Sequence, residues 1–178
     1  MGQEFHAPID YPKSYRYIKT VMDSIKFYLV ADTYGCFSNF AQYPIHIDGE
    51  LWPTSEHYFQ GQKFEDADQR EAIRRARSAM AASKMGRDRT KKLRADWEQV
   101  KDEIMLAAVR AKFNQHLKLA STLLGTRDAQ IIEHTATDSY WGDGGNGHGK
   151  NKLGQILMQV REELRRGRPF DCDSRSNE

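Results

Sequence analysis

Apolar residues recur at helical spacing over residues 100–116, and this is the most regular pattern in the chain. Side chains three or four residues apart share one face of a helix, and here they are Val100, Ile104, Ala107, Ala108 and Ala111. Leu106, Val109 and Phe113 widen this apolar face. Because so much of its surface is apolar, the pattern predicts a helix that packs at the centre of the domain.

Shorter helical patterns cover residues 54–64, 66–76, 78–85, 118–124 and 151–166. Ser78 stands where an N-cap is expected, and Gly125 ends the fourth of these segments. Strand patterns cover residues 26–30 and 130–134, and residues 44–52 read as a hairpin around the Asp48-Gly49 pair. Strands do not alternate with helices, so we expect an α+β fold, a mostly helical single domain with a small antiparallel sheet or hairpin.

The length of 178 residues suits one domain. We expect this domain over residues 25–166, after a loose N-terminal extension (residues 1–24) and before a disordered tail (residues 167–178). The net charge of +2 is too small to indicate nonspecific nucleic-acid binding. Cys36 and Cys172 form no disulfide pattern, and no apolar run is long enough to cross a membrane. These features predict a cytoplasmic protein with no membrane partner and no obligate protein partner.

The helix over residues 54–64 carries the first candidate site. Glu56, Gln60 and Lys63 share one face at spacings of i, i+4 and i+7. A carboxylate beside an amine can supply an acid/base group and a nucleophile, and partial burial would make the amine more nucleophilic. The alternative is an exposed charge pair on an amphipathic helix.

A basic segment over residues 85–97 is the second candidate. Its cations include Arg87 and Arg89, and Trp97 follows them. Guanidinium groups beside a tryptophan suit a phosphorylated ligand that carries an aromatic base. The alternatives are a solvated basic loop and a tryptophan that belongs to the core.

A glycine-rich segment over residues 138–154 is the third candidate, and it contains Asp138, Trp141 and Asp143. Glycines allow close approach to a ligand, and the following helix start can hold an anion. Residues 144–150 spell G-x-x-x-x-G-K, but Asn151 stands where a P-loop needs Ser or Thr. A plain flexible loop is the alternative. No histidine or cysteine has metal-ligand spacing, so we expect no metal and no cofactor.

In combination, these motifs resemble the NADAR family over about residues 26–165. The matching pieces are Tyr34-Gly35-x-Phe37-Ser38-Asn39-Phe40, Asp48-Gly49-x-x-Trp52-Pro53-Thr54-Ser55-Glu56-His57-Tyr58-Phe59-Gln60, Lys63-Phe64, Met85-Gly86-Arg87-Asp88-Arg89, Trp97, Trp141-Gly142-Asp143-Gly144-Gly145 and Gly149-Lys150-Asn151-x-Leu153-Gly154. One departure is Gly61, where the family more often has alanine.

The resemblance implies cleavage of an N-glycosidic bond between ribose and a base. The implied substrates are phosphorylated ribosylamino-pyrimidine intermediates of riboflavin biosynthesis, whose removal limits damage, or ADP-ribose on guanine in nucleic acid. Nucleic acid would therefore be a partner only if it is ADP-ribosylated. A noncatalytic nucleotide-binding module is the alternative from another class.

The resemblance also suggests roles for individual residues. Lys63 would form a Schiff base with the sugar, while Glu56 or Asp138 moves protons. The competing mechanism is direct attack by water, with Glu56 as the base and Lys63 balancing charge. The implied substrate-binding residues are Asn39, Phe40, Arg87, Arg89, Trp97, Trp141, Gly142, Asp143 and Asn151.

Overall fold

The computed structural model describes residues 23–167. Nearly all of the expected N-terminal extension and C-terminal tail therefore lies outside the described residues. The fold class is α+β, as predicted, with helices α1–α6, one short 3-10 helix (Gly35–Phe37) and two small strand pairs within the described range. Among these helices, none is both long enough and apolar enough to cross a membrane.

The predicted hairpin is present. Strands β2 (Ile45–Ile47) and β3 (Glu50–Trp52) are antiparallel, and Ile45 pairs with Trp52. Asp48 and Gly49 form the turn between them with φ angles of 53° and 75°. These positive values are those that Asp-Gly tolerates in a two-residue hairpin turn.

The other strand pair is parallel and joins distant parts of the chain. Strand β1 (Ser24–Phe27) lies beside β4 (Gln130–Glu133), with Phe27 opposite Glu133. The prediction that the first strand continues to Val30 was wrong. The Asp32 carboxylate accepts hydrogen bonds from the backbone N–H groups of Tyr28 and Leu29, at 3.1 and 2.8 Å, and turns the chain away from the strand.

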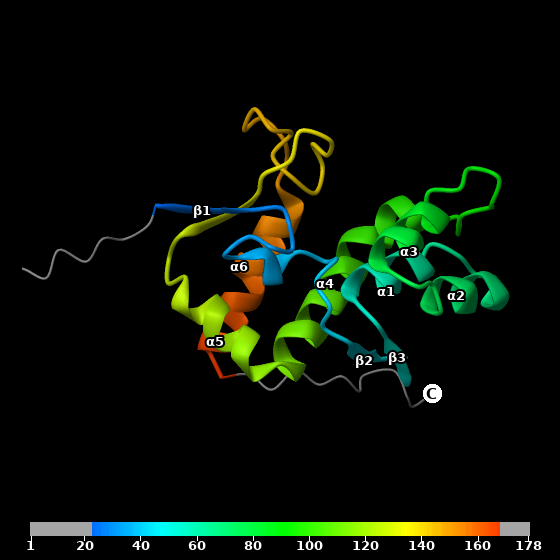
Figure 1. Cartoon of the computed structure of the whole chain (residues 1–178), viewed down its shortest axis with the longest axis horizontal. Coiled ribbons are helices and arrows are strands. Elements are labelled where there is room, and N and C mark those ends of the chain that lie inside the picture. Colours follow the sequence, from blue (N-terminus) through cyan, green and yellow to red (C-terminus); the bar gives the residue numbers. More distant parts are fainter. Residues whose placement is uncertain (1–22, 168–178) are drawn as a thin grey trace, which may run out of the picture.

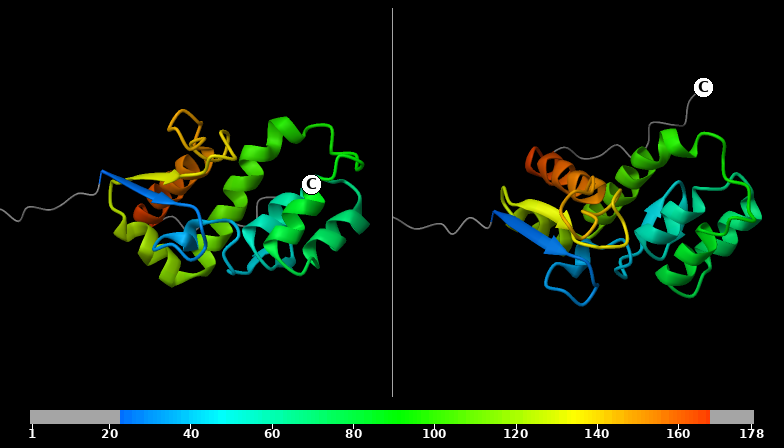
Figure 2. Two further views of the ribbon diagram at one scale, coloured as in Figure 1. Left: turned by 45° about the horizontal axis from the view of Figure 1, so that its top comes forward. Right: turned by 90° about the horizontal axis from the view of Figure 1, so that it is seen from above.

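Helix α4 (Trp97–Gln115) runs through the middle of the molecule, as its apolar face predicted (Figure 1). On one side of it lie β1, β4, α5 (Leu117–Gly125) and α6 (Lys152–Arg165), which we call the β4 half. On the other side lie the hairpin, α1 (Ser55–Gly61), α2 (Ala67–Arg74) and α3 (Ala79–Gly86), which we call the α1 half. Figure 2 shows the same division from two further directions.

Local sequence explains where three helices of the α1 half begin. The side chains of Thr54, Asp66 and Ser78 each accept a backbone N–H at the start of α1, α2 and α3. Such caps satisfy N–H groups that have no partner within the helix. Every residue of α1 is buried, so Glu56 is not a surface charge, and the alternative of an exposed charge pair on this helix does not hold.

Tight contacts fix the two halves internally. A Cβ added to Gly154 at the start of α6 would lie 2.1 Å from the Ile131 carbonyl oxygen, so α6 can approach β4 only because this residue is glycine.

Within the core, the Lys112 ammonium of α4 is almost fully buried, and its Nζ donates to the Ser38 carbonyl oxygen at 2.8 Å. Burial lowers the pKa of Lys112 to about 7.

Candidate active site

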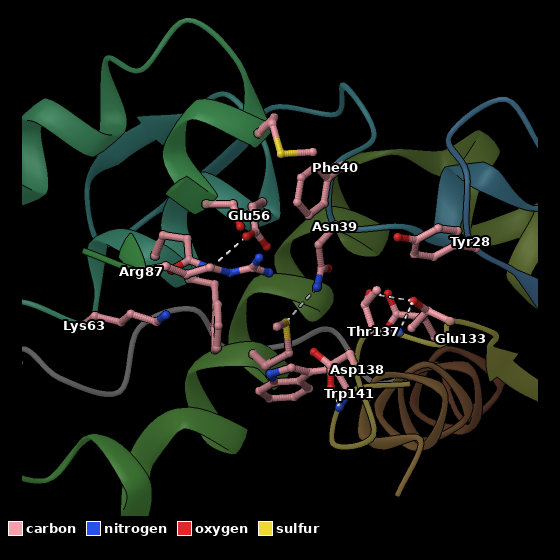
Figure 3. Close-up of a pocket in the computed structure, with 16 residues that line it drawn as sticks. Tyr28, Asn39, Phe40, Glu56, Lys63, Arg87, Glu133, Thr137, Asp138 and Trp141 are labelled. Carbon is pink, nitrogen blue, oxygen red and sulfur yellow. Dashed lines mark hydrogen bonds between the residues drawn. The ribbon is translucent and has the colours of Figure 1, made fainter. Parts of the chain in front are cut away.

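A cleft of about 270 Å³ lies where the two halves face each other. Its walls come from the segment after β1, from α1 and α3, from α4, and from the end of β4 with the loop that follows (Figure 3). Many of the residues singled out from the sequence line it together, namely Asn39, Phe40, Glu56, Lys63, Arg87, Asp138 and Trp141.

Glu56 stands in the first turn of α1 and is 5% exposed. Its Oε1 accepts a hydrogen bond of 2.7 Å from Nε2 of Gln60, one turn further along the same helix face. Burial raises the pKa of Glu56, while the hydrogen bond from Gln60 and the nearby charges of Lys63 and Arg87 oppose this shift. The site therefore holds a carboxyl group close to cationic partners, which suits proton exchange with the amine.

Lys63 lies just beyond α1, and its Nζ donates to the Gly86 carbonyl oxygen at 3.2 Å. The ammonium also lies 5.7 Å from the ring centre of Phe59 and 5.5 Å from that of Trp97. Burial lowers the pKa of Lys63 to about 8, against the opposing effect of Glu56. About a tenth of the amine is thus neutral and nucleophilic at pH 7, far more than for a lysine with the ordinary pKa of 10.5.

Three aromatic rings form a continuous wall beside this amine. Phe59 contacts Trp97 at 5.1 Å and Trp141 at 5.2 Å between ring centres. Trp141 lines the cleft, whereas Trp97 is 7% exposed and lines the neighbouring pocket. The wall offers Trp141 as a surface on which a flat base can pack.

A second pocket of about 360 Å³ adjoins the cleft and is basic. Arg89 and Lys91 line it, and Lys63 and Arg87 line both the pocket and the cleft. Guanidinium groups bind phosphate with paired hydrogen bonds. The Lys63 amine therefore lies at the junction of an aromatic cleft and a basic pocket.

Asp138 begins the glycine-rich loop and lines the cleft. Its Oδ1 accepts hydrogen bonds of 2.8 Å from the backbone N–H groups of both Tyr140 and Trp141. These bonds hold Trp141 in its place on the wall, so Asp138 contributes to the shape of the site as well as to its charge.

Gly142, Asp143 and Asn151 line neither pocket, and their contacts fit a structural role better than the substrate contact inferred from the sequence. A Cβ on Gly142 would lie 2.8 Å from the Glu133 carbonyl oxygen. Oδ2 of Asp143 pairs with Nδ1 of His134 at 2.8 Å, and its Oδ1 accepts the Gly145 N–H at 2.9 Å. The glycine-rich loop is thus folded onto the end of β4.

The sequence pattern did not indicate Glu133, the last residue of β4, which lines the cleft. Burial raises its pKa to about 7, and the charges of Asp138, Glu56 and Asp143 act in the same direction. The signal that could have found it is an acidic residue at the carboxyl end of a parallel strand, five residues before Asp138. Across residues 23–167, no three acidic, histidine or cysteine side chains are grouped as metal ligands.

A buried carboxyl, a lysine of lowered pKa and an aromatic wall define a site for acid/base and nucleophilic chemistry on a ring-bearing substrate. The NADAR domain model matches residues 26–165, and the chain belongs to this family. The prediction made from the sequence motifs is thereby confirmed.

Curated relatives agree with this assignment. The chain is 59% identical over 140 residues to N-glycosidase YbiA of Escherichia coli (strain K12), covering 79% of this chain and 88% of that protein. It is 46% identical over 145 residues to N-glycosidase Npun_R5314 of Nostoc punctiforme, covering 80% of this chain and 93% of that protein. A more distant match is the chloroplastic riboflavin biosynthesis protein PYRR of Zea mays, which is 37% identical over 155 residues. This match covers 79% of this chain and 25% of that protein.

A solved structure also matches. The NMR structure of the E. coli protein YbiA superposes with a TM-score of 0.77 at 56% identity, covering 82% of this chain and 88% of that one. The chain is accordingly an enzyme, a hydrolase that cleaves N-glycosyl bonds. This confirms the enzyme class expected from the sequence over the noncatalytic binding module.

Proposed function

We propose that the enzyme hydrolyses the C1′–N bond of phosphorylated ribosylamino-pyrimidine intermediates of riboflavin biosynthesis, through a Schiff base on Lys63. The observation that carries this proposal is the position of Lys63, an amine with a pKa of about 8 at the junction between the cleft and the basic pocket. Relatives named as riboflavin biosynthesis proteins in Vibrio vulnificus and Zea mays support the substrate class.

The substrate's own chemistry explains why an amine is useful. A sugar joined at C1′ to an exocyclic amine can open its ring to an imine. The neutral Lys63 amine adds to C1′, the C1′–N bond to the base breaks, and a Schiff base remains that water hydrolyses. Glu56, which interacts electrostatically with Lys63, takes up and returns the proton of the amine in this scheme.

The two adjoining spaces match the two ends of such a substrate. The pyrimidine packs on Trp141 in the cleft, and the phosphate lies with Arg87 and Arg89 in the basic pocket. Asn39 supports the base end, because its Oδ1 is buried and without a hydrogen-bond partner in the described part of the chain. A pyrimidine amine or carbonyl group would complete its bonding.

Turnover of two substrate types in parallel tests the substrate class. We expect release of the pyrimidine from the phosphorylated ribosylamino-pyrimidine, and little release of ADP-ribose from an ADP-ribosylated guanine oligonucleotide. The reverse preference would establish the alternative, an ADP-ribosyl-guanine hydrolase.

Borohydride reduction during turnover, followed by peptide mass spectrometry, tests the covalent step. We expect a sugar adduct on Lys63, and turnover without this adduct would favour direct attack by water.

A further inference from the structure

Cleavage of the C1′–N bond needs a proton on the departing nitrogen, and the residue that donates it is a separate question from the nucleophile. An amine anion is a very poor leaving group, so the proton must arrive as the bond breaks. Three carboxyl groups line the cleft, those of Glu56, Glu133 and Asp138. Their surroundings differ enough to separate their roles.

Glu56 and Asp138 are both engaged as hydrogen-bond acceptors. Burial raises the pKa of Glu56, but the 2.7 Å hydrogen bond that its Oε1 accepts from Gln60 and the charges of Lys63 and Arg87 act against this shift. Oδ1 of Asp138 accepts two backbone N–H groups at 2.8 Å each. Hydrogen bonds accepted in this way favour the ionised carboxylate, which suits a base that takes up a proton during the cycle but not an acid that must hold one from the start.

Glu133 has the opposite surroundings. Its Oε2 is buried and has no hydrogen-bond partner among residues 23–167. The charged groups that act on it are all acidic, namely Glu56 from α1 and Asp138 and Asp143 from the loop after β4. An unpartnered carboxyl among other acids is most stable in its protonated form, which can donate a hydrogen bond.

The backbone of Glu133 is held firmly although its side chain is not. Its N–H donates to Oδ1 of Asn151 at 3.0 Å, and its carbonyl oxygen accepts the Asp143 N–H at 2.9 Å. Figure 3 shows Glu133 and Lys63 on opposite sides of the cleft, with Trp141 between them. A base packed on Trp141 would therefore have the amine toward one end and this carboxyl group toward the other.

We propose that Glu133 is the general acid that protonates the departing nitrogen of the substrate. The inference rests on the proposed function for the order of steps. In the first half-reaction, the neutral Lys63 amine adds to the C1′ imine and Glu133 gives its proton to the base nitrogen. The second proton that this nitrogen needs passes from the Lys63 nitrogen through Glu56. The C1′–N bond then breaks with its electron pair on the base nitrogen, while the lone pair of the Lys63 nitrogen forms the Schiff base. The products are the free base amine, a protonated Schiff base on Lys63 and an ionised Glu133.

The second half-reaction restores both groups. Water adds its oxygen to C1′, Lys63 departs as a neutral amine, and the released proton returns to Glu133. Each group therefore ends the cycle as it began, with one water consumed. Under direct attack by water, the departing nitrogen needs the same donor, so the role of Glu133 does not depend on the covalent step.

The test compares Glu133→Gln and Glu133→Asp with the wild type on whichever of the two substrate types the wild type cleaves. Glutamine keeps the shape of the side chain but has no acid proton, so we expect kcat to fall by about 100-fold or more with little change in KM. Aspartate keeps the carboxyl group on a side chain one methylene shorter and should recover part of the lost kcat. Equal thermal unfolding midpoints for the three proteins exclude misfolding as the cause.

The pH profile supplies a readout that a merely structural role would not change. Activity that needs a neutral Lys63 and a protonated Glu133 rises with pH, is greatest between about pH 7 and 8, and falls above. Without the acid, the fall at high pH should disappear and the profile of Glu133→Gln should reach a plateau. A kcat of Glu133→Gln within threefold of wild type, or a retained fall at high pH, would overturn the proposal. Absence of the sugar adduct on Lys63 would instead overturn the proposal that Lys63 is the nucleophile. Failure of that proposal can therefore be distinguished from failure of the proposal that Glu133 is the general acid.

Discussion

Asn151 accepts a hydrogen bond from the backbone N–H of Glu133 at 3.0 Å, and this bond ties the start of α6 to the end of β4. The Nδ2 group of Asn151 also donates to the Ile131 carbonyl oxygen at 2.8 Å. Asn151 itself has a φ angle of 48°, in the left-handed region that asparagine tolerates better than most residues. One side chain therefore fixes the backbone on which the proposed acid stands.

Replacing Asn151 by glycine should lower both stability and turnover. Glycine accepts the same backbone angles, so only the two hydrogen bonds are lost, at about 1–3 kcal/mol in the free energy of unfolding. We expect kcat to fall further than KM rises, since Glu133 is displaced. Urea unfolding and steady-state kinetics measure the two effects, and a variant equal to wild type in both would contradict this role.

Lys63→Arg separates a nucleophile from a charge. Arginine keeps the positive charge near Glu56 but remains protonated and cannot form a Schiff base. We expect turnover to fall about a thousandfold or more, the scale seen when a nucleophile is removed. Lys63→Met, which removes both charge and amine, is the matched comparison. Substantial activity in Lys63→Arg would show that the charge is sufficient and that water attacks directly.

Gly86→Ala should damage the site from outside the cleft. A Cβ at this position would lie 2.0 Å from Oε1 of Gln60, the residue that holds Glu56. Overpacking of this kind costs about 1–3 kcal/mol of stability, and we expect a loss of activity from the displaced carboxylate. Gly125→Ala at the end of α5 is the control, because its Cβ meets nothing within 4 Å. Thermal unfolding and kcat should change only in Gly86→Ala.

Arg89→Ala tests the phosphate position. Arg89 is exposed and lines the basic pocket but not the cleft. We expect KM for the phosphorylated substrate to rise about tenfold or more, because a charge-assisted hydrogen bond contributes about 1.5–3 kcal/mol. The dephosphorylated substrate should be cleaved with the same KM by both proteins. A similar rise for both substrates would indicate that Arg89 does not meet the phosphate.

Lys112 gives stability a specific pH dependence. Its pKa is about 7 in the folded state against an ordinary value of 10.5, so the unfolded chain binds more protons between these values and stability rises with pH there. Lys112→Met lacks this dependence. Its stability relative to wild type should therefore increase as pH falls from 9 to 7, by up to about 1.4 kcal/mol per pH unit. Urea unfolding at both pH values checks this, with the exposed Lys118→Met as control.

Local signals in the sequence predicted much of the fold. The capping position of Ser78 and the Asp48-Gly49 turn act over a few residues, so short-range rules suffice to place α3 and the hairpin. The parallel pairing of β1 with β4 joins residues 24–27 to residues 130–133, and no local pattern encodes such a contact. The end of β1 was misplaced for a local reason: the apolar run continues to Val30, but the Asp32 carboxylate accepts the backbone N–H groups of Tyr28 and Leu29 and turns the chain earlier.

The candidate site was predictable to the extent that its residues sit in distinctive motifs. Glu56 and Lys63 drew attention because their spacing suits one face of a helix, although α1 ends at Gly61 and Lys63 lies in the turn that follows. Glu133 occupies an ordinary strand position, and its character comes from burial and from acids that only the folded chain brings near. Asp143 looked like a ligand-binding residue because acids are unusual in glycine-rich turns, yet its carboxylate holds the turn itself.

The position of the cleft between the β4 half and the α1 half determines how the enzyme loses activity as well as how it works. Lys63 and Glu133 stand on separate halves that meet along α4. Neither half by itself carries both the amine and the proposed acid. Catalytic rate therefore reports on tertiary structure: a molecule whose two halves have separated keeps its helices and its reactive lysine but no longer turns over substrate.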